Sequence, residues 1–260
     1  MGELTGRSAI VTGAGKGFGR AIAGALADAG AAVTLTSRTA ADIDAARLDI
    51  ERRGGRALAV AGDVCDMAAV ERVFDAHAAA FGAPTILVNC AAAPMPYGPV
   101  GVIDVDRWWQ SFAVHVRGSL NTMTRAVPAM QAAGKGCIIN VASMDGLFVQ
   151  PNNSAYAVAK ATLIRLSEHV ARENAATGVA VFPIHPGVAM TGIAEALLQS
   201  PDARQWVPDF VDLVAGIKAK GGHPHGTEHC GALCVALASG RFDHLSGQFI
   251  NFHEFDPEGA

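Results

Sequence analysis

Short runs of β-branched and other apolar residues alternate along this chain with longer, alanine-rich amphipathic stretches. The runs have the length of strands, and the stretches between them have the length and composition of helices. This alternation is typical of β-α-β units, in which helices cover both faces of a parallel sheet. We therefore predict an α/β fold over residues 1–260, a doubly wound parallel sheet of seven strands with helices on both faces.

The pattern predicts individual strands and helices as far as about residue 184 and one more strand near the end of the chain. The predicted strands are 9–11, 32–36, 57–60, 85–88, 137–141, 179–184 and 248–252, and the predicted helices are 17–29, 40–53, 67–81, about 105–132 and one that carries Tyr156 and ends near 176. The alternation breaks at about 188–224, a segment rich in proline and glycine. Long irregular insertions after a strand often cover a substrate site, so we expect a mobile substrate lid here, with a pair of ordinary surface helices as the alternative.

Composition narrows the choice of partners and of compartment. Hydrophobic residues make up 50% of the chain and charged residues only 17%, which favours buried contacts between subunits. The net charge of −4 without a basic block gives no reason to expect nucleic acid or a membrane surface as a partner. The chain shows no signal peptide and no run long enough for a membrane helix, so we expect a soluble, cytoplasmic protein. Its five cysteines lack metal-ligand spacing and are expected to be reduced thiols, with no metal bound.

A glycine-rich turn joins the first predicted strand to the first predicted helix. It reads Thr12-Gly13-Ala14-Gly15-Lys16-Gly17-Phe18-Gly19. Glycines let the backbone turn sharply and approach a pyrophosphate, and the start of a helix offers free amides to an anion. Because a strand precedes this turn and a helix follows it, the turn predicts a dinucleotide-binding site of the Rossmann type.

The end of the second predicted strand indicates which dinucleotide binds. Proteins that bind NAD commonly place an acidic residue there to hold the ribose 2′-hydroxyl, but this chain reads Thr36-Ser37-Arg38. Arg38 can form paired hydrogen bonds with a 2′-phosphate, and Lys16 in the glycine turn provides a second cation. We therefore predict NADP(H), with NAD as the less favoured cofactor; alternatively, Arg38 is a solvated surface charge.

Further candidates for the cofactor site follow other strands of the same sheet. Ligands bind along the carboxyl edge of such sheets. We expect Asp63 to accept a hydrogen bond from the adenine amino group and Asn89 to brace neighbouring backbone, although each can instead be a structural cap. At the nicotinamide end of the cofactor we expect the Val188 amide and the Thr191 hydroxyl to lie near the carboxamide group. The remaining candidates on this edge are Val64, Cys90, Ala91, Pro186 and Gly187.

A trio of polar side chains predicts proton transfer. Tyr156 and Lys160 are four residues apart and therefore share a helix face, and Ser143 follows a predicted strand. A cation beside a phenol favours the phenolate, so we expect Lys160 to lower the pKa of Tyr156 and make it a general acid and base. The Ser143 hydroxyl can hold a substrate oxygen against the phenol.

These motifs together resemble the short-chain dehydrogenase/reductase family over nearly the whole chain. The family pattern T-G-x3-G-x-G matches Thr12 to Gly19, and D-V matches Asp63-Val64. The pattern Y-x3-K with an upstream serine matches Tyr156 and Lys160 with Ser143, and P-G matches Pro186-Gly187. The resemblance implies that Ser143 orients the reacting oxygen and that Tyr156 transfers the proton. It also implies that Lys160 lowers the tyrosine pKa and binds the nicotinamide ribose, while hydride moves directly between cofactor and substrate.

The chain departs from the family pattern at two places near the site. Asn89-Cys90-Ala91-Ala92 replaces N-N-A-G, so that an alanine stands in place of a glycine next to the cofactor. His115 stands where the family has an asparagine that bends the long helix and holds a water in the proton relay. We include His115 as a candidate catalytic residue that holds this water or titrates near neutral pH, and a core histidine that only preserves the bend is the alternative.

The leading hypothesis is an oxidoreductase that transfers hydride between NADP(H) and a carbonyl group or secondary alcohol. The predicted pocket loops carry apolar residues, which favours a hydrophobic ketone. A catalytically silent NADP(H)-binding regulator and a cofactor-retaining isomerase or dehydratase are the alternatives. The resemblance further implies a homodimer or homotetramer formed by the long helices.

Overall fold

The strands form where the sequence has apolar runs that are buried on both sides. In the computed structural model, which describes residues 2–221 and 226–255, they make one parallel sheet in the order β3-β2-β1-β4-β5-β6-β7. The strands are β1 (Ser8–Thr12), β2 (Ala32–Thr36), β3 (Arg56–Ala59), β4 (Ile86–Asn89), β5 (Gly136–Val141), β6 (Val179–His185) and β7 (Ile250–Asn251). The predicted seven-stranded parallel sheet is thus confirmed, with a last strand shorter than predicted.

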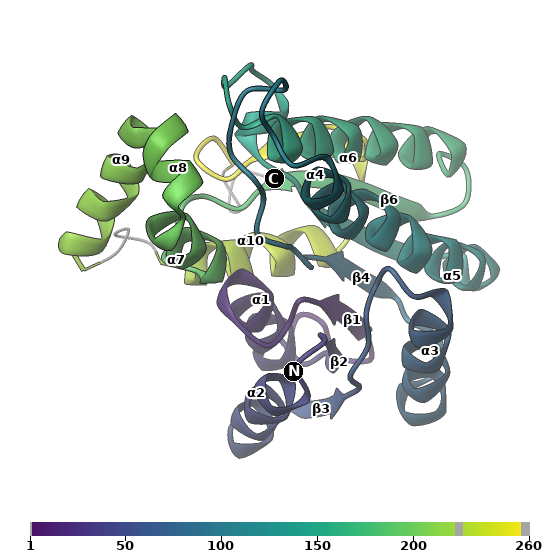
Figure 1. The fold of residues 1–260 in the computed structure, drawn as a ribbon. Helices are drawn as coiled ribbons and strands as arrows, with labels where there is room; N and C mark the ends of the chain where they lie inside the picture. Colours follow the sequence, from purple (N-terminus) through teal and green to yellow (C-terminus); the bar gives the residue numbers. More distant parts are fainter. Residues whose placement is uncertain (1, 222–225, 256–260) are drawn as a thin grey trace.

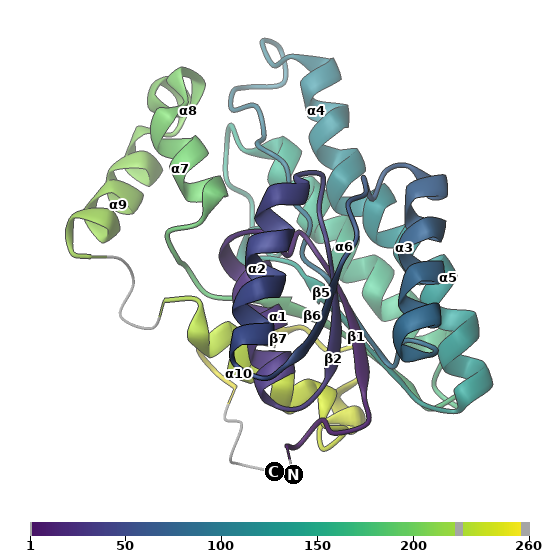
Figure 2. The ribbon, with the colours of Figure 1, turned by 90° about the horizontal axis from the view of Figure 1, so that it is seen from below.

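Helices cover both faces of this sheet (Figures 1 and 2). One face carries α1 (Gly17–Asp28), α2 (Ala40–Arg52) and α10 (Glu228–Ala238), and the other carries α3 (Met67–Phe81), α5 (Gly118–Ala133) and α6 (Ser154–Glu173). Successive residues of a strand point to opposite faces, so Cys137 and Ile139 join the first layer of the core while Ile138 joins the second. The alternating strand residues therefore explain the two layers.

The long predicted helix at 105–132 contains an irregular turn in its middle. It consists of α4 (Val105–Phe112), a π-helical turn (Ala113–Arg117) and α5. Such turns add a residue to one helical repeat and shift the direction in which side chains point. His115 lies in this turn and is directed into the protein, where it is 1% exposed.

The segment at about 188–224 forms three helices over most of its length. They are α7 (Gly192–Gln199), α8 (Pro201–Trp206) and α9 (Pro208–Ala219), and they stand beside the sheet rather than on either face (Figures 1 and 2). Residues 222–224 of the predicted lid lie outside the described residues. The sequence pattern did not predict α10, which packs closely on α1: a Cβ on Gly231 would lie 2.7 Å from the Cβ of Ala25.

The strand order determines where a ligand can bind. The chain moves outward from β1 to β2 and β3, then crosses back to β4 on the other side of β1. The loops that follow β1 and β4 therefore diverge and leave a crevice at the carboxyl edge, which is the usual ligand position in such sheets. None of the helices in the described part of the chain is long and apolar enough to cross a membrane.

Candidate active site

The glycine turn after β1 is shaped by contacts that leave no room for side chains. Gly13 has a φ of 64°, and a Cβ on it would lie 2.8 Å from the carbonyl oxygen of Cys90. A Cβ on Gly19 would lie 2.3 Å from the carbonyl oxygen of Gly13. Gly17 has a φ of 54°, and a Cβ on it would lie 3.0 Å from the side chain of Thr191. This bare backbone at the start of α1 fits the close approach of a pyrophosphate.

Thr12 connects the glycine turn to the end of β4. Its Oγ1 accepts hydrogen bonds from the backbone amides of Cys90 and Ala91, both at 3.0 Å. The two loops at the switch point are thereby held together. Burial raises the pKa of the Cys90 thiol to about 12, so this residue is a neutral thiol. All five cysteines are free.

Asn89 belongs to a buried hydrogen-bond chain below the site. Its Nδ2 donates to Asn140 Oδ1 at 2.8 Å, and its Oδ1 accepts from the Thr122 hydroxyl at 2.6 Å. The chain continues from Asn140 Nδ2 to the Ser167 hydroxyl at 2.8 Å. These bonds join β4, β5, α5 and α6 through side chains, whereas the backbone after Asn89 is held by Thr12, so bracing of that backbone by Asn89 stays a prediction.

The two cations expected to hold a 2′-phosphate differ in their surroundings. Arg38 is exposed directly after β2, and it forms no ion pair within residues 2–221 and 226–255. Lys16 instead pairs with Asp42 of α2 at 3.1 Å. Asp42 also packs against the glycine turn, since a Cβ on Gly15 would lie 2.7 Å from the Asp42 Cβ and 3.4 Å from the Ser37 hydroxyl. A carboxylate that the strand-end pattern did not reveal therefore lies beside the predicted phosphate site.

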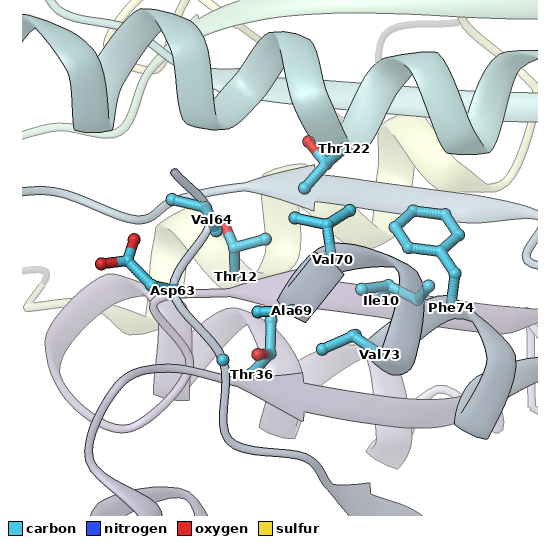
Figure 3. Close-up of a pocket in the computed structure, with 11 residues that line it drawn as sticks. Ile10, Thr12, Thr36, Asp63, Val64, Ala69, Val70, Val73, Phe74 and Thr122 are labelled. Atoms are coloured by element: carbon cyan, nitrogen blue, oxygen red, sulfur yellow. The ribbon is translucent and has the colours of Figure 1, made fainter. Parts of the chain in front are cut away.

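Asp63 and Val64 lie at the adenine end of the edge. Figure 3 shows a small, mainly apolar pocket beside them, with the Asp63 carboxylate pointing away from the apolar side chains. Asp63 Oδ1 accepts from the backbone amide of Cys65 at 2.9 Å, and the Val64 carbonyl oxygen accepts from Asn121 Nδ2 at 2.9 Å. The cap alternative for Asp63 is thus present in the geometry, and the adenine role stays a prediction.

The loop after β6 reaches back to the glycine turn. Pro186 is buried, and Gly187 has a φ of 83° with a Cβ position 3.0 Å from the ring of Phe252. Val188 is 39% exposed, whereas Thr191 lies against Gly17. This loop therefore closes the crevice from the β6 side and brings Thr191 next to the start of α1.

Ser143, Tyr156 and Lys160 converge at the end of β5. Lys160 Nζ lies 5.4 Å from the centre of the Tyr156 ring and donates a hydrogen bond to the Val141 carbonyl oxygen at 2.6 Å. Ser143 is 7% exposed, and its hydroxyl lies close enough to Tyr156 to lower the pKa of the phenol. The three side chains predicted from the sequence form one cluster on this edge.

The expected lowering of the Tyr156 pKa is not found in the chain by itself. Desolvation by the surrounding protein raises the pKa of Tyr156, the charge of Asp145 raises it further, and the hydrogen bond from Ser143 lowers it. Burial also lowers the pKa of Lys160 to about 8, against smaller opposing effects of Cys90 and Asp145. The expectation considered the lysine charge alone and omitted the desolvation of both groups.

His115 contacts the ring of Tyr156 edge-on, with the ring centres 5.6 Å apart. Burial and the charge of Lys160 lower its pKa well below the usual value, and the backbone of Ala93 raises it less. Neither ring nitrogen makes a hydrogen bond of ordinary geometry. His115 is therefore a neutral imidazole at neutral pH, so titration in that range, one of the two expected roles, is not supported.

Three segments from distant parts of the chain meet above Tyr156. The Gly98 amide donates to the Asn152 carbonyl oxygen, and Asn152 Nδ2 donates to the Trp206 carbonyl oxygen, both at 2.9 Å. Asn152 has a φ of 65°. Apolar side chains from the same segments pack into one cluster, which contains Met95, Tyr97, Tyr156, Leu197, Trp206, Val207, Phe210 and Val211.

No sequence pattern predicted a role for Asp42, Asn152, Asn153 or Asp145 individually. A signal exists for Asn152, because asparagine adopts positive φ more readily than most residues and here follows a proline. No comparable pattern marks Asp42, whose contacts with Lys16 and Gly15 depend on how α2 packs. Within the described ranges, no three His, Cys, Asp or Glu side chains are grouped to hold a metal ion.

The comparisons agree with this fold. The family model described as short chain dehydrogenase matches residues 7–202. The cis-4-hydroxycyclohexanecarboxylate dehydrogenase of Sinomonas cyclohexanicum is 37% identical over 198 residues, which cover 76% of this chain and 79% of that protein. The chain therefore belongs to the short-chain dehydrogenase family, and it is an oxidoreductase of the kind that binds a nicotinamide dinucleotide.

Solved structures of similar proteins match nearly the whole chain. A putative short-chain dehydrogenase/reductase from Burkholderia xenovorans is 31% identical with a TM-score of 0.83, and the match covers 96% of each chain. A putative gluconate dehydrogenase from Agrobacterium tumefaciens is 26% identical with a TM-score of 0.82, covering 95% of this chain and 94% of that one. The similarity thus includes α10 and β7, which lie beyond the part matched by the family model.

Proposed function

We propose that the protein is an NADP(H)-dependent oxidoreductase that interconverts a hydrophobic ketone and its secondary alcohol. The observation that carries this proposal is the convergence of Ser143, Tyr156 and Lys160 at the carboxyl edge, beside a glycine turn without room for side chains. Bound NADPH supplies the hydride for the carbonyl carbon, and the chain supplies the proton and the surroundings.

Tyr156 gives its proton to the carbonyl oxygen during reduction and takes it back during oxidation. The raised pKa keeps the phenol protonated at neutral pH, which suits the donor role. Ser143, next to the phenol, turns its single O–H toward the same substrate oxygen and donates a hydrogen bond to it. Lys160, with a pKa of about 8, is mostly cationic at pH 7 and stabilises the negative charge that develops on the phenol.

His115 completes the proposed catalytic set. Its neutral ring lies against Tyr156, and its nitrogens lack partners in a buried position. A water bound to one of these nitrogens would satisfy it and could pass a proton toward Lys160, as expected for the relay. The alternative, in which His115 only maintains the bend of the helix, predicts no effect on proton transfer.

The apolar cluster around Tyr156 supports a hydrophobic substrate. Apolar walls exclude water from the carbonyl group and bind the carbon skeleton of a ketone. The relative from Sinomonas cyclohexanicum is named for a hydroxyl group on a cyclohexane ring, which makes cyclic ketones a sensible first choice. We propose that α7 to α9 act as the substrate lid, because Trp206 is bonded to the loop that precedes Tyr156.

The NADP(H) preference is proposed from the charges at the end of β2. Arg38 is exposed and forms no ion pair in the described ranges, whereas Lys16 is engaged with Asp42. Arg38 is therefore the principal cation for the 2′-phosphate, and Lys16 becomes available only when that phosphate displaces Asp42. We therefore expect Arg38 to contribute more than Lys16 to the preference for NADP(H) over NAD(H).

Exchange of Arg38 tests this preference. For Arg38→Asp we expect the ratio of kcat/KM with NADPH to that with NADH to fall by about 100-fold, since a bidentate contact becomes a repulsion. Asp42→Asn is the matched variant and should raise the same ratio by freeing Lys16. An unchanged ratio in Arg38→Asp would refute the assignment.

We also propose a homodimer or homotetramer. Trp109, Leu120 and Val158 on α4, α5 and α6 are 57%, 43% and 44% exposed, so the long helices carry apolar side chains at the surface. A single-chain mass in sedimentation equilibrium at micromolar concentration would contradict this assembly.

A further inference from the structure

Asp145 is a carboxylate beside Tyr156 that the proton transfer described above does not use. It lies in a short turn (Met144–Gly146) directly after Ser143. The turn packs tightly on α6, because a Cβ on Gly146 would lie 2.8 Å from the backbone of Lys160 and Ala161. The Asp145 amide donates to the Ser143 hydroxyl at 3.2 Å. The backbone of Asp145 is thus fixed within the proposed catalytic cluster.

The carboxylate acts on side chains from two other segments. Its charge raises the pKa of Tyr156 and Lys160 on α6 and that of Tyr97 in the loop after β4. Tyr97 and Tyr156 both belong to the apolar cluster that receives the lid helices. Asp145 also follows Ser143 in a turn that packs on the backbone of Lys160, so it lies close to the space in which a substrate would meet Tyr156.

Hydrogen-bond acceptors outnumber donors around this carboxylate. Asn153 Nδ2 donates to Asp145 Oδ2 at 3.1 Å. Asn153 is 2% exposed, and its own Oδ1 is buried without a hydrogen-bond partner. No salt bridge to Asp145 is found in the described ranges. Asp145 itself is half-buried, and burial raises its pKa. A partly desolvated carboxylate with one neutral donor is stabilised when a further donor reaches it.

We propose that Asp145 is a specificity-determining residue that accepts a hydrogen bond from a donor group on the substrate, such as a second hydroxyl near the reacting carbonyl. The same charge disfavours substrates that carry a carboxylate at that position. The preferred substrates are then hydroxylated ketones and the corresponding diols rather than ketones with a purely hydrocarbon skeleton. This inference rests on the proposed function, since Asp145 can select only among ketones that the site reduces.

A set of matched cyclohexanones tests the proposal. The 2-, 3- and 4-hydroxycyclohexanones are compared with the methylcyclohexanones substituted at the same positions, because hydroxyl and methyl groups are similar in size. At one position or more, we expect kcat/KM to be about 10-fold or more higher for the hydroxyl compound, because a built acceptor rejects a substrate that lacks the donor. If the wild type reduces none of these ketones, the proposed function fails; if it reduces them all without preferring hydroxyl at any position, only the role of Asp145 fails.

Two variants locate the preference at Asp145. Asp145→Leu removes both acceptor oxygens, and we expect the ratio of kcat/KM for the hydroxyl compound to that for the methyl compound to fall by about 10-fold; an effect of the lost charge on Tyr156 acts on both compounds and cancels in this ratio. Asp145→Asn removes the charge at nearly constant shape, and it should raise kcat/KM for 4-oxocyclohexanecarboxylate by about 10-fold relative to 4-methylcyclohexanone. The proposal would be overturned if the hydroxyl-to-methyl ratio were unchanged in Asp145→Leu and the carboxylate-to-methyl ratio were unchanged in Asp145→Asn.

Asp243→Asn is the control for a general effect of losing an acid. Asp243 is also a carboxylate whose pKa is raised by desolvation, but it is exposed and lies near Arg7 at the opposite end of the strands. This variant should leave both substrate ratios unchanged. A shift equal to that of Asp145→Asn would mean that the change in net charge, rather than a local contact, is responsible, which would overturn the proposal.

Discussion

Two buried histidines show how the cofactor half of this protein (residues 8–89) differs from its substrate half (residues 90–221). His77 in the cofactor half has both ring nitrogens paired, with the Thr34 hydroxyl at 2.8 Å and the Ser8 hydroxyl at 3.1 Å. His115 in the substrate half is equally buried, yet neither ring nitrogen has a hydrogen-bond partner. Buried polar groups are normally paired, and unpaired ones concentrate where a ligand or water completes the structure. The first histidine is paired within the fold, whereas the second has unpaired nitrogens, which favours the proposed role of His115 in the active site.

The same contrast applies to the way in which each half holds its shape. The glycine turn in the cofactor half is fixed by backbone contacts that no other residue type allows. In the substrate half, the segment α7 to α9 is joined to the loop before Tyr156 by a side-chain bond, from Asn152 to the Trp206 carbonyl oxygen. One substitution should therefore abolish binding in the first half but only weaken it in the second.

The largest effect is expected in the glycine turn. In Gly19→Ala the new methyl group would lie 2.3 Å from the Gly13 carbonyl oxygen, so the turn must open. We expect NADPH affinity, measured by fluorescence titration, to fall by about 100-fold. Gly192→Ala is the matched control, because a Cβ there meets nothing within 4 Å. Wild-type affinity in Gly19→Ala would show that the turn does not hold the cofactor.

Exchange of the two histidines should affect different properties. His77→Leu leaves the Thr34 hydroxyl without its partner and removes one of the bonds of the Ser8 hydroxyl, which still donates to the Ala83 carbonyl oxygen, and we expect the free energy of unfolding in urea to fall by about 2 kcal/mol. His115→Leu removes two unpaired nitrogens and should leave stability within about 1 kcal/mol of wild type, while kcat falls if the ring holds a water. Equal losses of stability in both variants would contradict the comparison.

The pH dependence of stability checks the state of His77. Burial lowers its pKa from 6.5 to about 4 in the folded chain. Its contribution is therefore complete above pH 6.5 and is lost as the pH falls toward 4, by about 1 kcal/mol per pH unit. His77→Leu should reduce this slope, whereas substitution of the exposed His169 by glutamine should preserve it.

A smaller effect is expected at the contact between loop and lid. In Asn152→Ala the bond to the Trp206 carbonyl oxygen is lost, and we expect KM for the ketone to rise about 5-fold while KM for NADPH is unchanged. Asn152→Gly should raise the ketone KM equally but retain about 1 kcal/mol more stability, because glycine tolerates the φ of 65°. Unaltered ketone KM in both variants would argue against the lid.

These differences explain what the sequence could predict. The parallel sheet, the glycine turn and the meeting of Tyr156 with Lys160 follow from local rules of strand length, glycine geometry and helix periodicity. The partners of Asn152 and the contact between Asp42 and Lys16 depend on how distant helices pack, so no local pattern contains them. The raised pKa of Tyr156 was missed for the same reason, since desolvation depends on everything that surrounds the phenol. Helix α10 was missed because its residues are apolar on every side and show no amphipathic period.

The central claim, proton transfer by the Tyr156 phenol, is tested most directly by Tyr156→Phe. This change removes one oxygen atom and keeps the ring that packs against His115. We predict that kcat for ketone reduction, followed by the absorbance of NADPH, falls by about 1,000-fold or more, while the Kd for NADPH stays within a few-fold of wild type. A kcat close to that of the wild type would contradict the account.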